Sequence, residues 1–121
     1  MDKKVLVVDD SASMRQMVTF TLQSAGFETI EGANGVEALS VIGGQSIDLV
    51  ITDLNMPEMD GITLIKELRC KPEFKFTPIV LLTTESQDAK KQEGRAAGAT
   101  GWMVKPFNPE QLLTVVKKVV R

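Results

Sequence analysis

A short run of branched aliphatic residues that ends in a carboxylate is the feature that most constrains the fold of this chain. Residues 49–51 are Leu, Val and Ile, Asp53 follows them closely, and Pro57 and Gly61 punctuate the turn beyond. Such an apolar run predicts a strand buried on both faces of a sheet. A charged side chain at the end of a buried strand is costly unless a partner offsets it. Other residues must therefore meet Asp53 at the end of its strand.

The composition is that of a single soluble domain. The chain has 121 residues, of which 43% are hydrophobic, and its 14 basic and 16 acidic side chains leave a formal charge of -2. This size suits one domain, and the lack of a basic excess argues against nucleic-acid binding. No signal peptide or membrane-spanning run is recognisable, so we expect a cytoplasmic protein without membrane association. The chain has no histidine, and its one cysteine, Cys70, can form no internal disulfide.

Four more strand-like runs follow the same plan and alternate with segments of helical periodicity. In the first helical segment we expect Ser13 to cap a helix that Gly26 ends, and in the last we expect Asn108 and Pro109 to begin the helix. The expected strands are residues 4–8, 27–31, 49–53, 79–83 and 101–104, and the expected helices follow them near residues 13–25, 34–42, 62–71, 87–97 and 108–120.

This alternation of strands and helices predicts an α/β fold. Parallel strands joined by helices require right-handed crossovers, which place helices on both faces of the sheet. We therefore expect a doubly wound, five-stranded parallel sheet with five helices, built as one domain over residues 1–121. In open sheets of this class, ligands bind at the carboxyl ends of the strands.

Acidic, hydroxyl and amine side chains follow the strands at these carboxyl ends. Two carboxylates about 4 Å apart repel by roughly 4 kcal/mol at an effective dielectric constant near 20, so a cluster of acids calls for a cation. Oxygen ligands with few other donors suit Mg²⁺ better than Zn²⁺ or Ca²⁺. The expected cluster consists of Asp9 and Asp10 after the first strand, Asp53 after the third, Thr83 and Thr84 after the fourth, and Lys105 after the fifth.

This set of groups suits phosphoryl transfer onto a carboxylate. A carboxylate can attack phosphorus to give an acyl phosphate, while a metal ion, an ammonium and a hydroxyl neutralise the charge on the transferring oxygens. Asp53 ends the middle strand of the predicted sheet and is the expected acceptor. Asp9 and Asp10 share one strand end, which suits them to hold the metal.

Four sequence motifs carry a resemblance to a known family. They are VLVVDD at residues 5–10, ITDLNMPEMDG at 51–61, LLTTE at 81–85 and WMVKPF at 102–107. In this order and at these separations, the chain resembles the receiver domain of two-component response regulators over its whole length, with nothing left over for an output domain. Within that family it is most similar to the stand-alone chemotaxis regulators. The resemblance implies a flavodoxin-like sheet with strand order 2-1-3-4-5.

The resemblance also implies roles for residues at matching motif positions. Asp53 would be the phosphoacceptor, Asp10 and Asp53 would bind Mg²⁺ directly, and Asp9 would bind it through water. The backbone carbonyl of Asn55 would be a further metal ligand. Thr83 would hydrogen-bond a phosphoryl oxygen.

Two further matched positions complete the implied switch. Lys105 would pair with a phosphoryl oxygen and would form a cis peptide with Pro106, which an X-Pro bond tolerates. Trp102 stands where the family usually has Tyr or Phe, and Thr84 stands where it usually has a small residue. Thr83 and Trp102 are the expected switch pair, in which the indole is larger than the usual ring and has a different polar group.

The implied function is a signalling switch rather than an enzyme that acts on other substrates. A sensor histidine kinase (CheA-like) would donate the phosphoryl group, and the domain would catalyse only transfer to its own aspartate and its own dephosphorylation. The switch would change a surface made by the fourth helix, the fifth strand and the fifth helix. The leading output partner is a flagellar motor switch protein, and a phosphatase would be a further partner.

Three alternatives stay open at this point. The first is a phosphorelay intermediate that passes the phosphoryl group to another histidine protein. The second is a small aspartate-nucleophile phosphatase of the haloacid dehalogenase type, which would want a second acid where this chain has Asn55, and a lid domain. The third is a flavin-binding electron carrier, which would want a phosphate-binding loop where this chain has Asp9 and Asp10.

Overall fold

The computed structural model describes residues 3–84 and 88–120, over which strands and helices alternate. The strands are β1 (Lys4–Val8), β2 (Glu28–Gly32), β3 (Leu49–Asp53), β4 (Ile79–Thr83) and β5 (Gly101–Val104). The helices are α1 (Ala12–Ser24), α2 (Gly35–Ile42), α3 (Gly61–Arg69), α4 (Asp88–Ala97) and α5 (Pro109–Val119), with a short 3-10 helix, η1, at Pro72–Phe74.

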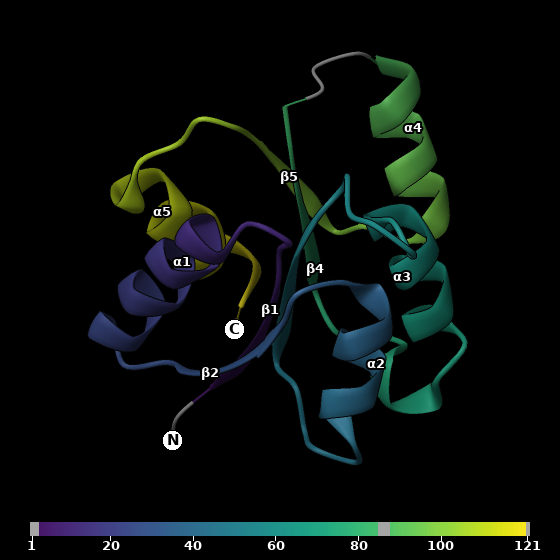
Figure 1. Cartoon of the computed structure of the whole chain (residues 1–121), viewed down its shortest axis with the longest axis horizontal. Coiled ribbons are helices and arrows are strands. Elements are labelled where there is room, and N and C mark those ends of the chain that lie inside the picture. Colours follow the sequence, from purple (N-terminus) through teal and green to yellow (C-terminus); the bar gives the residue numbers. More distant parts are fainter. Residues whose placement is uncertain (1–2, 85–87, 121) are drawn as a thin grey trace.

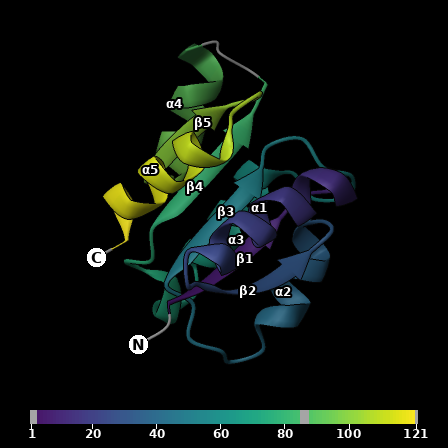
Figure 2. The ribbon, with the colours of Figure 1, turned by 90° about the vertical axis from the view of Figure 1, so that its left-hand side faces the viewer.

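The five strands form one parallel sheet in the order β2-β1-β3-β4-β5. Helices α1 and α5 cover one face of this sheet, and α2, α3 and α4 cover the other, so the molecule has three layers (Figure 1). The view turned by 90° shows α1 and α5 lying in front of the strands (Figure 2). The flavodoxin-like fold predicted from the sequence is confirmed.

Each face of the sheet has its own apolar core. The residues of one strand alternate between the two cores, because successive side chains of a strand point to opposite faces. On β3, for example, Val50 packs toward α2, α3 and α4, whereas Leu49 and Ile51 pack toward α1 and α5. Strands β3 and β4 are buried along their whole length, as the uninterrupted apolar runs predicted.

Side-chain caps set the helix starts, and one of them differs from the prediction. The cap of α1 is Ser11, whose hydroxyl accepts a hydrogen bond from the Met14 N–H, whereas Ser13 lies inside the helix. The choice follows from Asp9, which binds the Ser11 N–H at 2.9 Å and turns the chain into the helix earlier. Asn108 caps α5 as predicted, and Asn34 caps α2 in the same way.

Two other element boundaries can be compared with the sequence predictions, namely the starts of the second strand and of the fourth helix. Strand β2 begins one residue later than expected, at Glu28, because the N–H of Phe27 still bonds Leu22 at the end of α1. Gln87, the expected first residue of the fourth helix, lies outside the described residues. Among the described helices, none has the length and apolar character needed to span a bilayer.

Candidate functional site

The candidate site is made by side chains that lie just beyond the carboxyl ends of β1, β3 and β5. Each of them lies on the same face as an apolar residue of its strand. Val7, Ile51 and Met103 belong to the core under α1 and α5. Two positions further along each chain segment stand Asp9, Asp53 and Lys105. Because side chains two residues apart lie on the same face of a strand, these three groups converge at the carboxyl edge of the sheet.

One ammonium group joins the two buried acids of the site. The Nζ of Lys105 lies 3.0 Å from Asp53 Oδ1 and 3.3 Å from Asp9 Oδ2. The acids are nearly inaccessible, with Asp9 1% and Asp53 6% exposed. Asp53 Oδ1 also accepts the N–H of Leu54 at 3.0 Å. One lysine thus offsets two carboxylates drawn from strands far apart in the sequence.

The net effect of burial and of the charges of the cluster is to shift the pKa values of Asp53 and Lys105 in the same direction, upward. Burial raises the pKa of Asp53 above its ordinary value of 3.8, and the charge of Asp9 adds to the effect, while Lys105 opposes it. For Lys105, burial works to lower the pKa, but the hydrogen bond and charge of Asp53, together with Asp9, outweigh it and raise the pKa above 10.5. The ammonium of Lys105 therefore stays charged, while the ionised form of Asp53 remains disfavoured, chiefly because it is buried.

The residues at this edge can also hold a metal ion. One carboxylate oxygen each from Asp9, Asp10 and Asp53 lies within 4.8 Å of the others, and Asp10 is exposed while the other two are buried. Three hard oxygen donors open to water on one side fit an ion that keeps several water ligands, as Mg²⁺ does. Asn55 lies two residues beyond Asp53 and is exposed. Burial raises the pKa of Asp53, and a cation bound here would favour its ionised form.

The two predicted switch residues share the opposite face of the sheet. Trp102 pairs with Leu81 in the β4–β5 register and packs with it in the core under α2, α3 and α4. Thr83 lies two residues beyond Leu81 on the same strand and is fully buried. Its carbonyl accepts the N–H of Lys105 at 2.8 Å, so Thr83 is joined directly to the backbone that carries the site lysine.

Trp102 is half-buried, and the Nε1 atom of its indole is buried without a hydrogen bond. Its Nε1 is the one buried side-chain polar atom in the described part of the chain that lacks a partner. The ring lies against Gly94 of α4, and the Nζ of Lys91 is 5.5 Å from the ring centroid. An unpaired buried donor of this kind costs about 1–3 kcal/mol, so this arrangement leaves a stabilising contact unmade.

Sequence reasoning placed the acids and the lysine but missed residues that support them. Arg15 donates from Nη1 to the backbone carbonyl of Asp9 at 2.6 Å. Gly61 was interpreted as a turn residue, yet its role is close approach, since a Cβ there would lie 2.3 Å from the carbonyl oxygen of Asp53. The cis peptide between Lys105 and Pro106 was predicted and is present. A polar residue one helical turn into α1 was the only sequence signal for Arg15.

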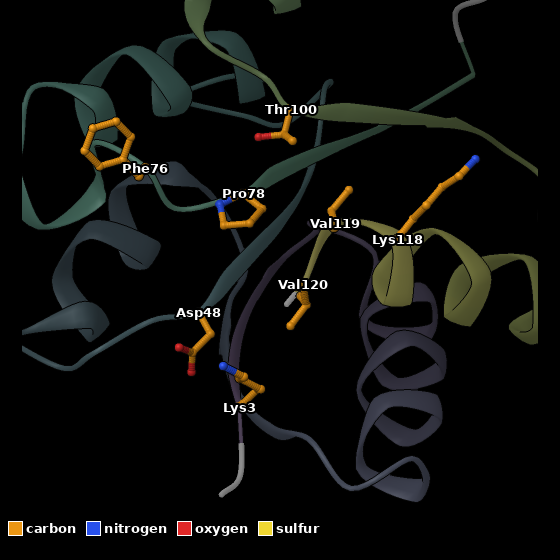
Figure 3. A pocket seen from close by; sticks show the side chains of 8 residues that line it. All are labelled: Lys3, Asp48, Phe76, Pro78, Thr100, Lys118, Val119 and Val120. Atoms are coloured by element: carbon orange, nitrogen blue, oxygen red, sulfur yellow. The ribbon is translucent and has the colours of Figure 1, made fainter.

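A cavity of about 490 Å³ lies at the other edge of the sheet and is not part of this site. It is lined by residues near the amino ends of β1, β3 and β4 and by the end of α5. Val119, Val120 and Pro78 form its apolar side, with Lys118 on one flank and Asp48 and Lys3 on the other (Figure 3). The acids that could bind a metal are absent from its lining.

Comparisons with known proteins agree with this geometry. The profile of the response regulator receiver domain matches residues 5–117. Chemotaxis protein CheY1 of Helicobacter pylori is 41% identical over 111 residues, which cover 90% of each chain. The solved structure of chemotaxis response regulator CheY4 of Vibrio cholerae is similar with a TM-score of 0.95 and 52% identity, over 99% of this chain and 100% of that one. The transcriptional regulatory protein SrrA of Staphylococcus aureus is 36% identical over 121 residues, which are 49% of its length.

Proposed function

Because the chain belongs to the response regulator receiver domain family, we propose that it is a phosphorylation-driven switch whose acceptor is Asp53. The convergence of Asp9 and Asp53 on the ammonium of Lys105, at 3.3 and 3.0 Å, carries this proposal. Family membership also sets aside the phosphatase and flavin-carrier alternatives. The proposed receiver domain spans residues 1–121, of which residues 5–117 match the family profile.

The transfer step uses an oxygen of Asp53 as the nucleophile. Oδ1 is held by Leu54 and Lys105, whereas Oδ2 receives no hydrogen bond from the described residues and is the oxygen left to attack. Attack on the phosphorus of a kinase phosphohistidine forms the O–P bond and breaks the P–N bond. The electron pair of that bond returns to the imidazole nitrogen of the donor.

Lys105 and Thr83 would stabilise the phosphoryl group on Asp53. Lys105 already faces the acceptor, so its ammonium can turn from the carboxylates to a phosphoryl oxygen with little movement. Thr83 ends the neighbouring strand, one position beyond the partner of Asp53 in the register. Its hydroxyl would donate to a second phosphoryl oxygen, and this contact would draw β4 toward the acceptor.

Mg²⁺ is the cofactor that the acidic cluster supports best. Asp9, Asp10 and Asp53 would hold it, Asp9 through water, with the backbone carbonyl of Asn55 as a further ligand. When bound, the ion supplies charge neutralisation for the transferring phosphoryl oxygens. The chain's own contribution is to hold three carboxylates together although they repel one another.

The output would pass through Thr83 and Trp102. Both side chains lie on the face of the sheet that α4 covers. Once Thr83 moves, a conformer of Trp102 in which the indole N–H has a hydrogen-bond partner would be favoured, because that N–H is unpaired in the present one. A shift from about 1:99 to 99:1 between two conformers requires around 5.5 kcal/mol of differential stabilisation. The new charge on Asp53 and the satisfied indole would contribute to it.

The proposed pathway is chemotaxis in the cytoplasm. The similarity to chemotaxis proteins of two bacteria supports it. A sensor histidine kinase (CheA-like) would act as donor, and the surface of α4, β5 and α5 would bind a flagellar motor switch protein. A phosphatase would shorten the signal, alongside the domain's own dephosphorylation.

The experiment follows Trp102 fluorescence and intact mass in the same sample. Mg²⁺ is added first and acetyl phosphate second, to wild type and to Asp53→Asn. We expect a mass gain of one phosphoryl group in wild type only, dependent on Mg²⁺, together with a change in fluorescence. Samples without Mg²⁺ control for non-enzymatic acetylation.

The two signals separate the parts of the proposal. A phosphoryl adduct without a fluorescence change would remove Trp102 from the switch and keep Asp53 as acceptor. An adduct on Asp53→Asn of the same size as in wild type would disprove the acceptor assignment. Absence of both Mg²⁺ binding and adduct in wild type would overturn the proposed function.

A further inference from the structure

Arg15 links the segment of Asp9 and Asp10 to strand β2. The proposed function gives this arginine no role. Its Nη1 donates to the backbone carbonyl of Asp9 at 2.6 Å, and its Nε lies 3.1 Å from Glu31 Oε1. The Arg15 side chain is 20% exposed, so it is only partly open to solvent. Glu31 stands on β2, and the next residue, Gly32, accepts the N–H of Asp9 at 3.2 Å.

These contacts fix the backbone on both sides of Asp10. The Asp9 carbonyl belongs to the same rigid peptide plane as the N–H of Asp10, so holding that oxygen sets the direction in which the Asp10 chain leaves. On the other side, Asp9 Oδ1 accepts the N–H of Ser11 at 2.9 Å. Asp10 itself receives no hydrogen bond from the described residues and is exposed. Its orientation is therefore imposed by its neighbours.

We propose that Arg15, held by Glu31, is a positioning residue that aims the carboxylate of Asp10 at the metal site. The proposal rests on the proposed Mg²⁺-dependent function. In this proposal Arg15 contacts neither the ion nor the phosphoryl group. It acts only by fixing the orientation of the peptide plane between Asp9 and Asp10. Groups that orient metal ligands in this way commonly change metal affinity by 10–100-fold when they are removed.

The direction in which Mg²⁺ affinity changes when Arg15 is removed distinguishes a positioning role from a purely electrostatic one. Arg15 is a cation near three acids, so if it acted only through its charge, its removal would strengthen Mg²⁺ binding. If it positions Asp10, its removal frees the peptide plane and weakens binding. The two roles therefore predict opposite changes.

The test is Mg²⁺ titration of the whole chain, followed by backbone amide NMR shifts of residues 9–11 and 53–55. We expect Arg15→Met, which keeps the aliphatic stem, to bind Mg²⁺ about 10-fold more weakly than wild type. Glu31→Gln should weaken binding less, about 3-fold, because the bond from Arg15 to Asp9 survives. Arg15→Lys should recover part of the affinity, since an ammonium can still donate to the Asp9 carbonyl. Arg95→Ala, which removes an arginine from the last turn of α4, is the charge-matched control and should bind like wild type.

A second readout excludes a general loss of structure. At saturating Mg²⁺, the rate of phosphorylation by acetyl phosphate should return to within about twofold of wild type in Arg15→Met, because only metal affinity has changed. Unchanged or tighter Mg²⁺ binding by Arg15→Met would overturn the positioning role. Failure of wild type to bind Mg²⁺ would instead overturn the proposed function, so the two failures are distinguishable.

Discussion

The two edges of the sheet are made by the same strands and differ in almost every chemical respect. At the carboxyl edge, two acids with exposed fractions of 1% and 6% share one ammonium at 3.3 and 3.0 Å. At the amino edge, the cavity of Figure 3 is lined by aliphatic side chains, by Lys3, Asp48 and Lys118, and by Phe76, which is 87% exposed. Charge is concentrated and enclosed at one edge and spread over separate, more exposed side chains at the other.

This contrast shows that the strands themselves are alike at both edges, and that the residues just beyond the strand ends create the site. The apolar rows run unchanged from one edge to the other, and only the residues just beyond the strands differ. Substitutions at the carboxyl edge should therefore alter stability, Mg²⁺ binding and pH dependence together. Equivalent substitutions at the amino edge should have clearly smaller effects.

The largest difference should come from two glycines. At Gly61 an added Cβ would lie 2.3 Å from the Asp53 carbonyl oxygen, and the backbone must move to admit it. We expect Gly61→Ala to lower the free energy of unfolding by about 3 kcal/mol in urea denaturation. Gly44 at the amino edge has φ +81 but open space around it, so Gly44→Ala should cost only about 1 kcal/mol. Equal losses at the two glycines would contradict the close packing of α3 against the acceptor.

Removal of the site ammonium should have the next largest effect. Lys105→Met leaves Asp9 and Asp53 without their cation, and we expect a loss of about 2 kcal/mol, below the roughly 3–5 kcal/mol of a fully buried pair because water reaches the lysine. Since folding raises the pKa of Lys105, its stabilisation is present below 10.5 and is lost as the pH rises through the folded pKa. Urea denaturation at neutral and alkaline pH checks both statements.

The control for that substitution lies at the amino edge. Lys118→Met removes the same charge beside the cavity, and the free energy of unfolding should change by no more than about 0.5 kcal/mol. A comparable loss in both variants would show that overall charge, rather than the acid pair, determines the effect of Lys105.

Removal of the acceptor charge should stabilise the protein. The pKa of Asp53 is raised by folding, so its ionised form opposes folding above 3.8, and this penalty disappears as the pH falls through the folded pKa. Without Mg²⁺, Asp53→Asn should gain on the order of 1 kcal/mol at neutral pH and nothing below 3.8. Saturating Mg²⁺ should reverse the order, because the ion binds more tightly to wild type, which has all three acids, than to Asp53→Asn.

Thermal or urea unfolding over pH and Mg²⁺ concentration measures the reversal. If Asp53→Asn were less stable than wild type at neutral pH without Mg²⁺, the acid cluster would be compensated already and would not call for a cation.

The smallest effect should come from the exposed aromatic ring at the amino edge. Phe76 is 87% exposed and contacts Lys75, whose Nζ is 5.4 Å from the ring centroid. Such an exposed cation–π contact is worth about 0.5–1 kcal/mol at most. Phe76→Ser should therefore change the free energy of unfolding by about 0.5 kcal/mol or less, and a loss of 2 kcal/mol would mean that the ring packs against the other lining residues of the cavity far more closely than its exposure indicates.

The strand ends were predictable from the sequence because alternation within a strand is a local property. Asp9, Asp53 and Lys105 each stand two positions beyond an apolar residue of one core, so strand assignment alone brings them to one edge. The fold class followed from the same alternation of strands and helices, and it was confirmed. The roles of Thr83, Trp102 and Asn55 in signalling and metal binding stay predictions.

The supporting contacts could not be predicted, because they depend on distances between separate elements. Arg15 reaches the Asp9 carbonyl only because α1 packs against β1 and β2 at one particular depth. The unpaired indole of Trp102 follows from the position of α4 over β5, and the close approach of Gly61 follows from the start of α3. Residue type and spacing carry no information about any of these distances.

The site lysine makes contacts over very long stretches of chain, which has a consequence for protein synthesis. Lys105 lies 96 residues from Asp9 and 52 from Asp53 in the sequence. A ribosome releases the acids well before the lysine that offsets them, and long-range contacts of this kind form late in folding. A nascent chain therefore carries Asp53 before the lysine that faces it in the native site. Under the proposed function, competence to accept a phosphoryl group would appear only with the complete native fold, so an unfinished chain would not divert phosphoryl groups from a kinase.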